Sequence, residues 1–259
     1  MTSQIQNSPP PHKTLVFSIA LNGYQWLYQQ HLLSHQAYAK KNNYEYVVIS
    51  KPSISNLGME CCWLKLVLLK AALVNGYQSV MFVDADALIN KNCPPIDEIF
   101  VDGKYLYMAN GYTGRFNSGV MIAKKSEALI NWLNKLILSR CQHLPSIDST
   151  GWGENGHIIH FSKQVNFIKV LHHRWNNTFD EKLNDHIRHF SYGPMRTSKL
   201  KTLAHHVLRR SLGLLVKYVF AKQGVNHVLA SDVLQLETQR VIVNYPQFQS
   251  THKYRAIAR

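Results

Sequence analysis

The sequence has few cysteines and no long apolar run. Its four cysteines, one adjacent pair and two isolated positions, lack the spacing of zinc ligands and of a dense disulfide framework. This usage favours a reducing compartment. The most apolar stretch, residues 212–220, contains a lysine and falls far short of the roughly 20 residues that a membrane-spanning helix requires. A transmembrane protein and a disulfide-rich secreted domain are therefore disfavoured.

Acidic residues are also scarce. There are 15 of them against 29 lysines and arginines, which gives a formal net charge of +14. Such a surplus indicates an anionic partner: a nucleic acid, an anionic membrane or a phosphorylated substrate. Against a nucleic acid, the sequence shows no RNP-like aromatic strand, no zinc-finger spacing and no recognisable helix-turn-helix.

The first 13 residues lack the apolar core of a signal peptide. They are polar and carry consecutive prolines, Pro9 to Pro11, so residues 1–13 are predicted to be a disordered lead-in. We expect a cytoplasmic protein because no export signal is visible. The remaining composition, 46% apolar and 17% charged over 259 residues, is typical of a folded chain with a sizeable core.

Strand and helix patterns alternate through the first part of the chain. We predict strands at 14–21, 45–50 and 79–83, the last of them apolar throughout, as in a central parallel strand. Helices are predicted at 24–41 and around residues 64–71, where apolar residues recur with helical spacing before an Asn75-Gly76 stop. This alternation indicates a single α/β domain wound in the Rossmann manner.

An acidic motif, Asp84-Ala85-Asp86, directly follows the predicted strand at 79–83. Ligands of open α/β sheets bind at the carboxyl ends of strands, and alternate side chains of an extended segment point the same way. Asp84 and Asp86 are therefore candidate ligands for one hard divalent cation, which can bridge to a diphosphate. The alternatives are a solvated turn and a haloacid-dehalogenase phosphatase, which also has such a motif after a strand.

Several further segments follow one another along the chain. They are 34–48 (SHQAYAKKNNYEYVV), Trp63-x-Lys65 before an apolar helix, Gly76-Tyr77 before FVDADALI, 116–121 (FNSGVM), 154–156 (ENG) and 189–193 (HFSYG). In this order they resemble the retaining glycosyltransferases of families 34 and 8, over residues 14–196. The resemblance implies a GT-A fold, in which a mixed, mostly parallel Rossmann-like sheet is flanked by helices, and a nucleotide-sugar transferase domain.

The resemblance also implies a donor site. Asp84 and Asp86, with Ala85 between them, and His189 as a third protein ligand would hold Mn²⁺ or Mg²⁺ on the diphosphate of a nucleotide-sugar. The other donor-binding positions that it implies are Lys65, Asn117, Ser118 and Arg196. From the residues alone, plainer roles stay open: a solvated lysine on a helix, a turn at 117–118, a structural histidine and a member of the basic tail.

The candidate catalytic residues are Glu154 and Asn155, in the segment where family 8 carries Asp-Gln-Asp. Retention at the sugar requires either a carboxylate nucleophile near the anomeric carbon or attack from the leaving-group face, with the phosphate accepting the proton. Glu154 is the available carboxylate, and the Asn155 amide oxygen would stabilise an oxocarbenium-like centre. Because Glu-Asn-Gly replaces Asp-Gln-Asp, a helix-start carboxylate is an equal alternative for Glu154.

Residues 197–259 are predicted to form a basic, largely helical extension packed on the domain. No acidic residue occurs between 196 and 222, whereas lysine and arginine are frequent there. Apolar residues recur with helical spacing beside these cations, at Leu208, Leu212, Leu215 and Val219. Two roles are open for this stripe: binding of 199–222 to an anionic membrane, at the inner membrane face, and packing on the domain.

The acidic motif and the resemblance together predict a metal-dependent glycosyltransferase. The expected donor is a nucleotide-diphosphate hexose such as UDP-galactose, and the expected acceptor is a glycan or a lipid-linked glycan, with retention of configuration. A nucleic-acid-binding basic protein and a dehalogenase-type phosphatase are the alternative functions.

Overall fold

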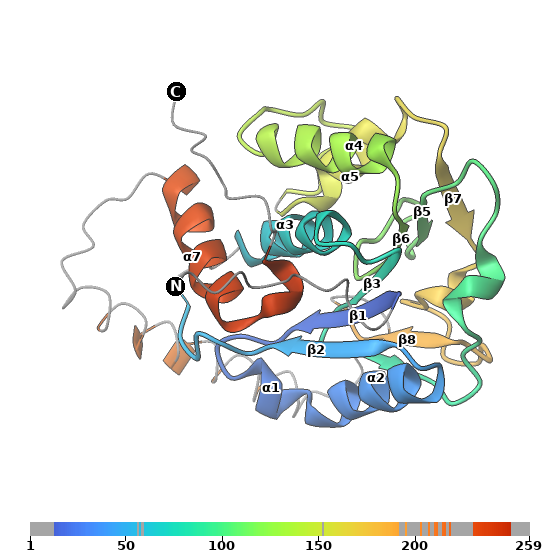
Figure 1. Ribbon diagram of the computed structural model, residues 1–259, viewed down its shortest axis with the longest axis horizontal. Coiled ribbons are helices and arrows are strands. Elements are labelled where there is room, and N and C mark those ends of the chain that lie inside the picture. Colours follow the sequence, from blue (N-terminus) through green and yellow to red (C-terminus); the bar gives the residue numbers. More distant parts are fainter. Residues whose placement is uncertain are drawn as a thin grey trace, which may run out of the picture.

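A computed structural model of the chain describes residues 13–55, 57, 60–151, 153–191, 195, 203, 207, 210–211, 214–215, 218 and 230–249. These residues build a six-stranded sheet with helices on both faces (Figure 1). Its strands, in spatial order, are β2 (Glu45–Ile49), β1 (Thr14–Ile19), β3 (Ser79–Val83), β6 (Val120–Lys124), β5 (Leu106–Ala109) and β7 (Ile168–Leu171).

One strand reverses the direction of this sheet. β1 pairs in parallel with β2 and with β3, and β5 pairs in parallel with β7, but β6 runs antiparallel to both β3 and β5. All five residues of β3 are buried, as expected of a central strand that is covered on both faces. The α/β sheet that the sequence predicts, and its mixed, mostly parallel character that the resemblance implies, are thereby confirmed.

The helices divide between the two faces (Figure 1). On one side lie α1 (Tyr24–Leu27) and α2 (Gln29–Lys41), and on the other lie α3 (Cys61–Val74), α4 (Glu127–Leu138) and α5 (Asn155–Ser162). Short 3₁₀ turns occur at η2 (Ile96–Ile99), η3 (His173–Trp175) and η4 (Pro246–Phe248). The prediction of one helix over 24–41 is wrong, because Tyr28, with φ −111°, separates α1 from α2.

A small second sheet extends the carboxyl end of β3. Its strands, β4 (Ala87–Ile89) and β8 (Ile187–His189), are antiparallel, and Ala87 lies opposite His189. His35 of α2 braces this sheet: its Nε2 donates to the Ala87 carbonyl at 2.7 Å, and its Nδ1 accepts from the Ser18 hydroxyl at 2.9 Å. Burial lowers the pKa of His35 to about 4, so the brace is neutral at physiological pH.

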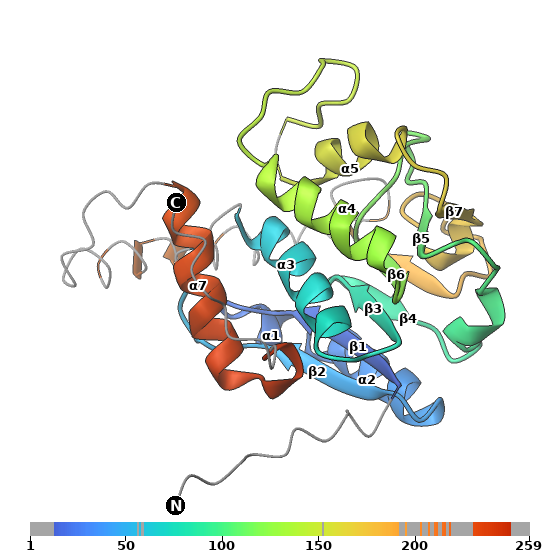
Figure 2. The same ribbon diagram turned by 45° about the horizontal axis from the view of Figure 1, so that its top comes forward.

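The described end of the chain packs against the domain. Helix α7 (Ala230–Asn244) lies beside α3 (Figure 2). Phe248 of η4 is fully buried, with its ring centroid 5.4 Å from that of Phe17 in β1. The Tyr245 hydroxyl accepts from the amides of Ser50 and Lys51 just after β2, at 2.8 and 2.9 Å. Residues 245–248 are therefore fastened to the edge of the sheet.

Among the residues described, no helix combines the length and the apolar character that crossing a bilayer requires.

Candidate functional site

The acidic motif lies where β3 ends and β4 begins. The Asp84 amide donates to the Gly119 carbonyl at 2.8 Å, and the Phe190 amide donates to the Asp86 carbonyl at 3.1 Å. Ala85 is buried and packs against Ala20 and Leu32. The motif is therefore held by β6 on one side and by the end of β8 on the other.

Asp84, Asp86 and His189 converge at this point. One ligand atom from each lies within 4.8 Å of the others. His189 Nε2 is 3.2 Å from Asp86 Oδ1 and 3.7 Å from Asp84 Oδ2. The histidine is buried, whereas the aspartates are partly exposed, Asp84 with 34% of its side chain. Two carboxylates and one imidazole that meet at an accessible edge fit a divalent cation such as Mn²⁺ or Mg²⁺.

The protonation of this cluster reflects its crowding. Loss of surrounding water, and the neighbouring Asp86 and Glu154, raise the pKa of Asp84, although Lys65 and His189 pull it down. Burial alone would lower the pKa of His189, but Asp86 and Asp84 outweigh it and raise that pKa. The pKa values of Asp84 and His189 are both raised, so this cluster favours an added positive charge. Either a proton or a metal ion can supply that charge.

Gly119 makes room for the histidine. A Cβ on this residue would lie 2.0 Å from His189 Cε1 and 2.9 Å from Asp84 Oδ2. Both contacts are shorter than non-bonded carbon and oxygen atoms allow. A glycine directly before β6 is therefore required for His189 to reach the two aspartates.

Lys65 and Glu154 form a buried ion pair behind the acidic motif. Lys65 Nζ lies 2.6 Å from Glu154 Oε1, 3.0 Å from the Ser118 hydroxyl and 3.2 Å from the Ser118 carbonyl. The Ser118 hydroxyl also donates to Glu154 Oε1. The three hydrogens of the ammonium group thus have three protein acceptors. The pair fastens α3 and the start of α5 to the segment before β6.

The amides of Asn155, predicted as a catalytic residue, and of Asn117, predicted to bind the donor, are likewise engaged within the protein. Asn155 accepts from the Ser118 amide at 3.0 Å and donates to the Phe116 carbonyl at 2.9 Å. Asn117 Oδ1 accepts from the Gly119 amide at 3.0 Å. The structure brings Lys65, Ser118, Glu154 and Asn155 together next to the motif, with their polar atoms bound to one another. Arg196 lies outside the described residues.

Known proteins resemble this chain in structure rather than in sequence. No protein-family model matches it, and no curated protein matches it significantly. Among solved structures, it resembles a glycosyltransferase involved in glycosylation of the major capsid of PBCV-1, with a TM-score of 0.57 and 10% identity over 76% of this chain and 98% of that one. The chain has a glycosyltransferase fold.

Two further glycosyltransferases match less well. They are GlyE of Streptococcus pneumoniae TIGR4, with a TM-score of 0.48 and 12% identity over 81% of this chain and 63% of that one, and mouse xyloside xylosyltransferase 1, with 0.39 and 12% over 69% and 97%. Because both scores are below 0.5, the shared glycosyltransferase fold is inferred from the capsid enzyme.

Sequence reasoning missed one residue of the site, Asn176. It follows η3, is fully buried and lies between Asn117 and His189. It belongs to no motif and no apolar period, so only the contact between distant segments reveals it. A buried amide must find hydrogen-bond partners, but the sequence does not indicate which ones.

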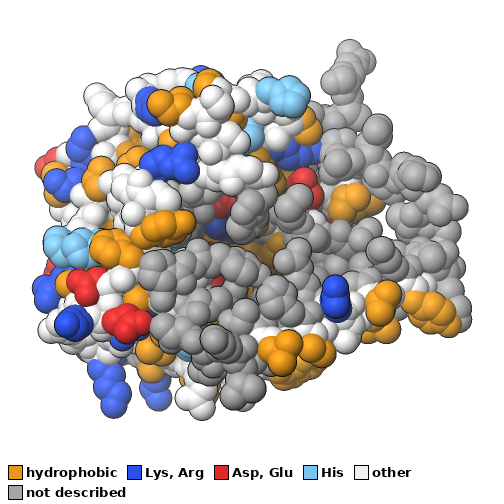
Figure 3. All heavy atoms as spheres, turned by 180° about the vertical axis from the view of Figure 1, so that it is seen from behind, with side chains coloured by type: hydrophobic (Ala, Val, Ile, Leu, Met, Phe, Trp, Pro, Cys, Tyr) orange, Lys and Arg blue, Asp and Glu red, His pale blue; other side chains and the backbone are white. Residues whose placement is uncertain are grey.

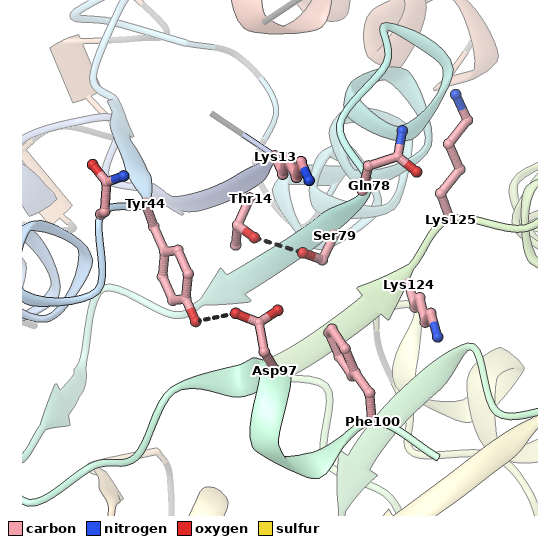
Figure 4. A pocket seen from close by; sticks show the side chains of 10 residues that line it. Lys13, Thr14, Tyr44, Gln78, Ser79, Asp97, Phe100, Lys124 and Lys125 are labelled. Atoms are coloured by element: carbon pink, nitrogen blue, oxygen red, sulfur yellow. Dashed lines mark hydrogen bonds between the residues drawn. The ribbon is translucent and has the colours of Figure 1, made fainter. Parts of the chain in front are cut away.

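A separate hollow of roughly 510 Å³ opens at the end of the sheet opposite to the acidic motif, where β1 and β3 begin (Figure 4). Lys13, Lys124 and Lys125 border it, around the hydroxyl pair of Thr14 and Ser79, whose oxygens are 2.7 Å apart. Ser79 begins β3, whereas the acidic motif follows the last residue of that strand. None of the predicted site residues that the structure describes lines this hollow. The motif predicted to bind the donor diphosphate therefore lies at the opposite end of β3 from this hollow.

Proposed function

We propose that this protein is a metal-dependent glycosyltransferase that moves a hexose from a nucleotide-diphosphate sugar to a glycan or lipid-linked acceptor. The observation that carries this proposal is the convergence of Asp84, Asp86 and His189 at the carboxyl end of β3. In open α/β sheets, this edge is where ligands bind. The glycosyltransferase fold supports the same assignment.

The charge of the site supports a divalent ion. Three carboxylates, Asp84, Asp86 and Glu154, face one ammonium group, Lys65, which leaves two negative charges while His189 is neutral. The residues that would hold the ion are Asp84, Asp86 and His189. When bound, a divalent cation supplies a Lewis acid that stabilises the charge of a departing diphosphate.

We further propose a UDP-hexose such as UDP-galactose as donor, with retention, in keeping with the resemblance to families 34 and 8. Glu154 Oε1 is bound by Lys65 and Ser118, which favours attack from the leaving-group face over a Glu154 nucleophile. In that route the bond from the anomeric carbon to the diphosphate breaks and a bond to the acceptor oxygen forms on the same face. The acceptor proton passes to a phosphate oxygen of the leaving group.

Nucleotide and metal are expected to stabilise the protein only together. At about 100 times its dissociation constant, UDP with Mn²⁺ should add about 2.7 kcal/mol to the free energy of unfolding. Chelator or Asp86→Asn should remove this gain, whereas Asp102→Asn, an exposed aspartate away from the site, should keep it. Thermal unfolding with UDP or GDP, with Mn²⁺ or with chelator, measures the effect and identifies the base.

Other results would favour other functions. Stabilisation by nucleotide that needs no metal and is unchanged in Asp86→Asn would contradict the proposal. Phosphate release without sugar transfer would point to a dehalogenase-type phosphatase. Salt-sensitive binding of generic DNA or RNA, unchanged by a nucleotide-sugar, would point to a nucleic-acid-binding protein.

We also propose that the basic extension contacts an anionic membrane. The apolar residues described between 203 and 218 are helical and exposed, with fractions from 44% for Leu215 to 70% for Leu214. Figure 3 shows hydrophobic side chains protruding at its lower right edge, beside residues that are not described. Six lysines and arginines and no acidic residue occur between 197 and 222. A basic amphipathic helix can rest its apolar face in a bilayer surface while each cation adds about 1 kcal/mol.

Co-sedimentation with vesicles tests this membrane contact. The protein should bind vesicles that contain phosphatidylglycerol and ignore pure phosphatidylcholine. Replacing Leu203 and Leu214 with serine should weaken binding by roughly tenfold for each leucine, since each loses about 1.5 kcal/mol of apolar burial. Leu138→Ser, at an equally exposed leucine of α4, is the matched control. Protein that stays in the supernatant with anionic vesicles would contradict the proposal.

A further inference from the structure

The orientation of the Asn176 amide is fixed by its neighbours. Asn117 Oδ1 accepts from the Gly119 amide, so the Asn117 side chain presents an oxygen toward Asn176. Asn176 Nδ2 lies 2.9 Å from that oxygen and 3.0 Å from the Asn117 carbonyl. Only the NH₂ end of an amide can donate to two oxygens. Its oxygen must therefore point the other way.

The Asn176 oxygen determines which ring nitrogen of His189 carries the hydrogen. Asn176 Oδ1 lies 2.8 Å from His189 Nδ1, and because a carbonyl oxygen only accepts, Nδ1 must carry a hydrogen. In a neutral ring the other nitrogen, Nε2, then has none. Nε2 is the atom that faces Asp86 and Asp84. The His189 amide also donates to the Asn177 carbonyl at 2.9 Å, which fixes the backbone that carries the ring.

We infer that Asn176 is a positioning residue: it holds His189 as the Nδ1–H tautomer, with the Nε2 lone pair directed at Asp84 and Asp86. This inference rests on the proposed function for its consequence, which is metal binding. With the opposite tautomer, Nε2–H would donate a hydrogen bond to Asp86, and Nε2 would have no lone pair for a metal ion. With the Nδ1–H tautomer, a lone pair and two carboxylates face one point, and a cation satisfies all three.

The tautomer is measured without any metal. In metal-free protein, at a pH that leaves the ring neutral, ¹H–¹⁵N spectra should show the hydrogen of His189 on Nδ1. The signal is assigned by its loss in His189→Gln. Asn176→Asp keeps an acceptor and should keep this tautomer, whereas Asn176→Leu should release it to a mixture. Hydrogen on Nε2 in the unaltered protein, or no change in Asn176→Leu, would overturn the inference.

Metal affinity gives the second readout, with Mn²⁺ alone as the probe and electron paramagnetic resonance as the assay. Asn176→Leu should bind Mn²⁺ about 10- to 100-fold more weakly. Asn176→Asp should bind it within a few-fold of the unaltered protein, even though its carboxylate faces the two oxygens of Asn117 and costs stability. Equal losses in both variants would mean that Asn176 acts only through folding, and would overturn the inference.

A matched control removes an amide at the other end of the small sheet. Asn90 follows β4 and donates to the Asp185 carbonyl and side chain. Asn90→Leu should lower thermal stability without changing Mn²⁺ affinity. If the unaltered protein binds no Mn²⁺ while its His189 carries the hydrogen on Nδ1, the proposed metal site is wrong and the tautomer assignment stands. The two failures are thus distinguishable.

Discussion

Replacing Gly119 with alanine is expected to destroy the proposed metal site and to destabilise the fold. The new methyl group would lie 2.0 Å from His189 Cε1, and the ring is buried and held by Asn176. Its displacement should cost about 1–3 kcal/mol of unfolding free energy, as overpacking does elsewhere. Mn²⁺ affinity should fall by about 100-fold or more, since even changes behind a ligand cost up to that much. Chemical denaturation and Mn²⁺ titration measure the two effects.

Two controls isolate the collision. Gly103 has φ +72° and open space around its Cβ position, so Gly103→Ala should cost about 1–2 kcal/mol through backbone strain and leave Mn²⁺ affinity unchanged. In a His189→Ala background, Gly119→Ala should cost at least about 1 kcal/mol less than beside the intact ring, because contacting residues couple. Full Mn²⁺ affinity in Gly119→Ala would contradict the expected geometry.

Local patterns predicted the elements of this fold better than their ends. The apolar run at 79–83 became a fully buried strand, and the stop at Asn75-Gly76 coincides with the end of α3, where Gly76 has φ +115°. The predicted strand at 14–21 ends two residues earlier, at Ile19. The predicted helix at 24–41 breaks at Tyr28, whose ring contacts those of Tyr24 and His31. No glycine or proline marks that break, so the sequence carries no signal for it.

The residues of the candidate site were likewise predicted only in part. Asp84 and Asp86 follow a recognisable strand, so their place at its carboxyl end follows from general rules of α/β sheets. His189 came only from the resemblance, because it reaches the aspartates through the pairing of β4 with β8, about one hundred residues apart. Asn176 and the steric demand on Gly119 depend on that same pairing. A residue chosen by a distant contact leaves no periodic pattern, so neither was predicted.

The buried pair of Lys65 and Glu154 raises a different question, because the resemblance assigned one residue to the donor and the other to catalysis. Both are almost fully buried, and they lie 2.6 Å apart. The Glu154 carboxylate also acts on the proposed metal site, since it raises the pKa of Asp84 while Lys65 lowers it. Ion pairs of this kind are costly to break and often neutral to replace as a unit. Replacing Lys65 and Glu154 together should therefore separate their contribution to stability from their contribution to sugar transfer.

Lys65→Met is expected to destabilise the protein by about 3–5 kcal/mol, because Glu154 would be left charged, buried and without its ammonium partner. The double variant Lys65→Met/Glu154→Gln should regain most of this loss, since no unpaired charge remains and Ser118 can still donate to the amide oxygen. Denaturant unfolding of the two single variants and the double variant forms the cycle. Equal stability of Lys65→Met and the unaltered protein would contradict a structural ion pair.

The same double variant then decides the role of Glu154. A glutamine cannot form a covalent glycosyl intermediate in the place of a carboxylate nucleophile. If attack occurs from the leaving-group face, the refolded double variant should retain sugar transfer at a rate lowered by no more than about 100-fold, corresponding to about 2.7 kcal/mol in the barrier. A folded double variant that binds nucleotide and Mn²⁺ but transfers no sugar, while Lys65→Met still transfers it, would instead make Glu154 the nucleophile, with Lys65 and Ser118 as the groups that hold its carboxylate in place.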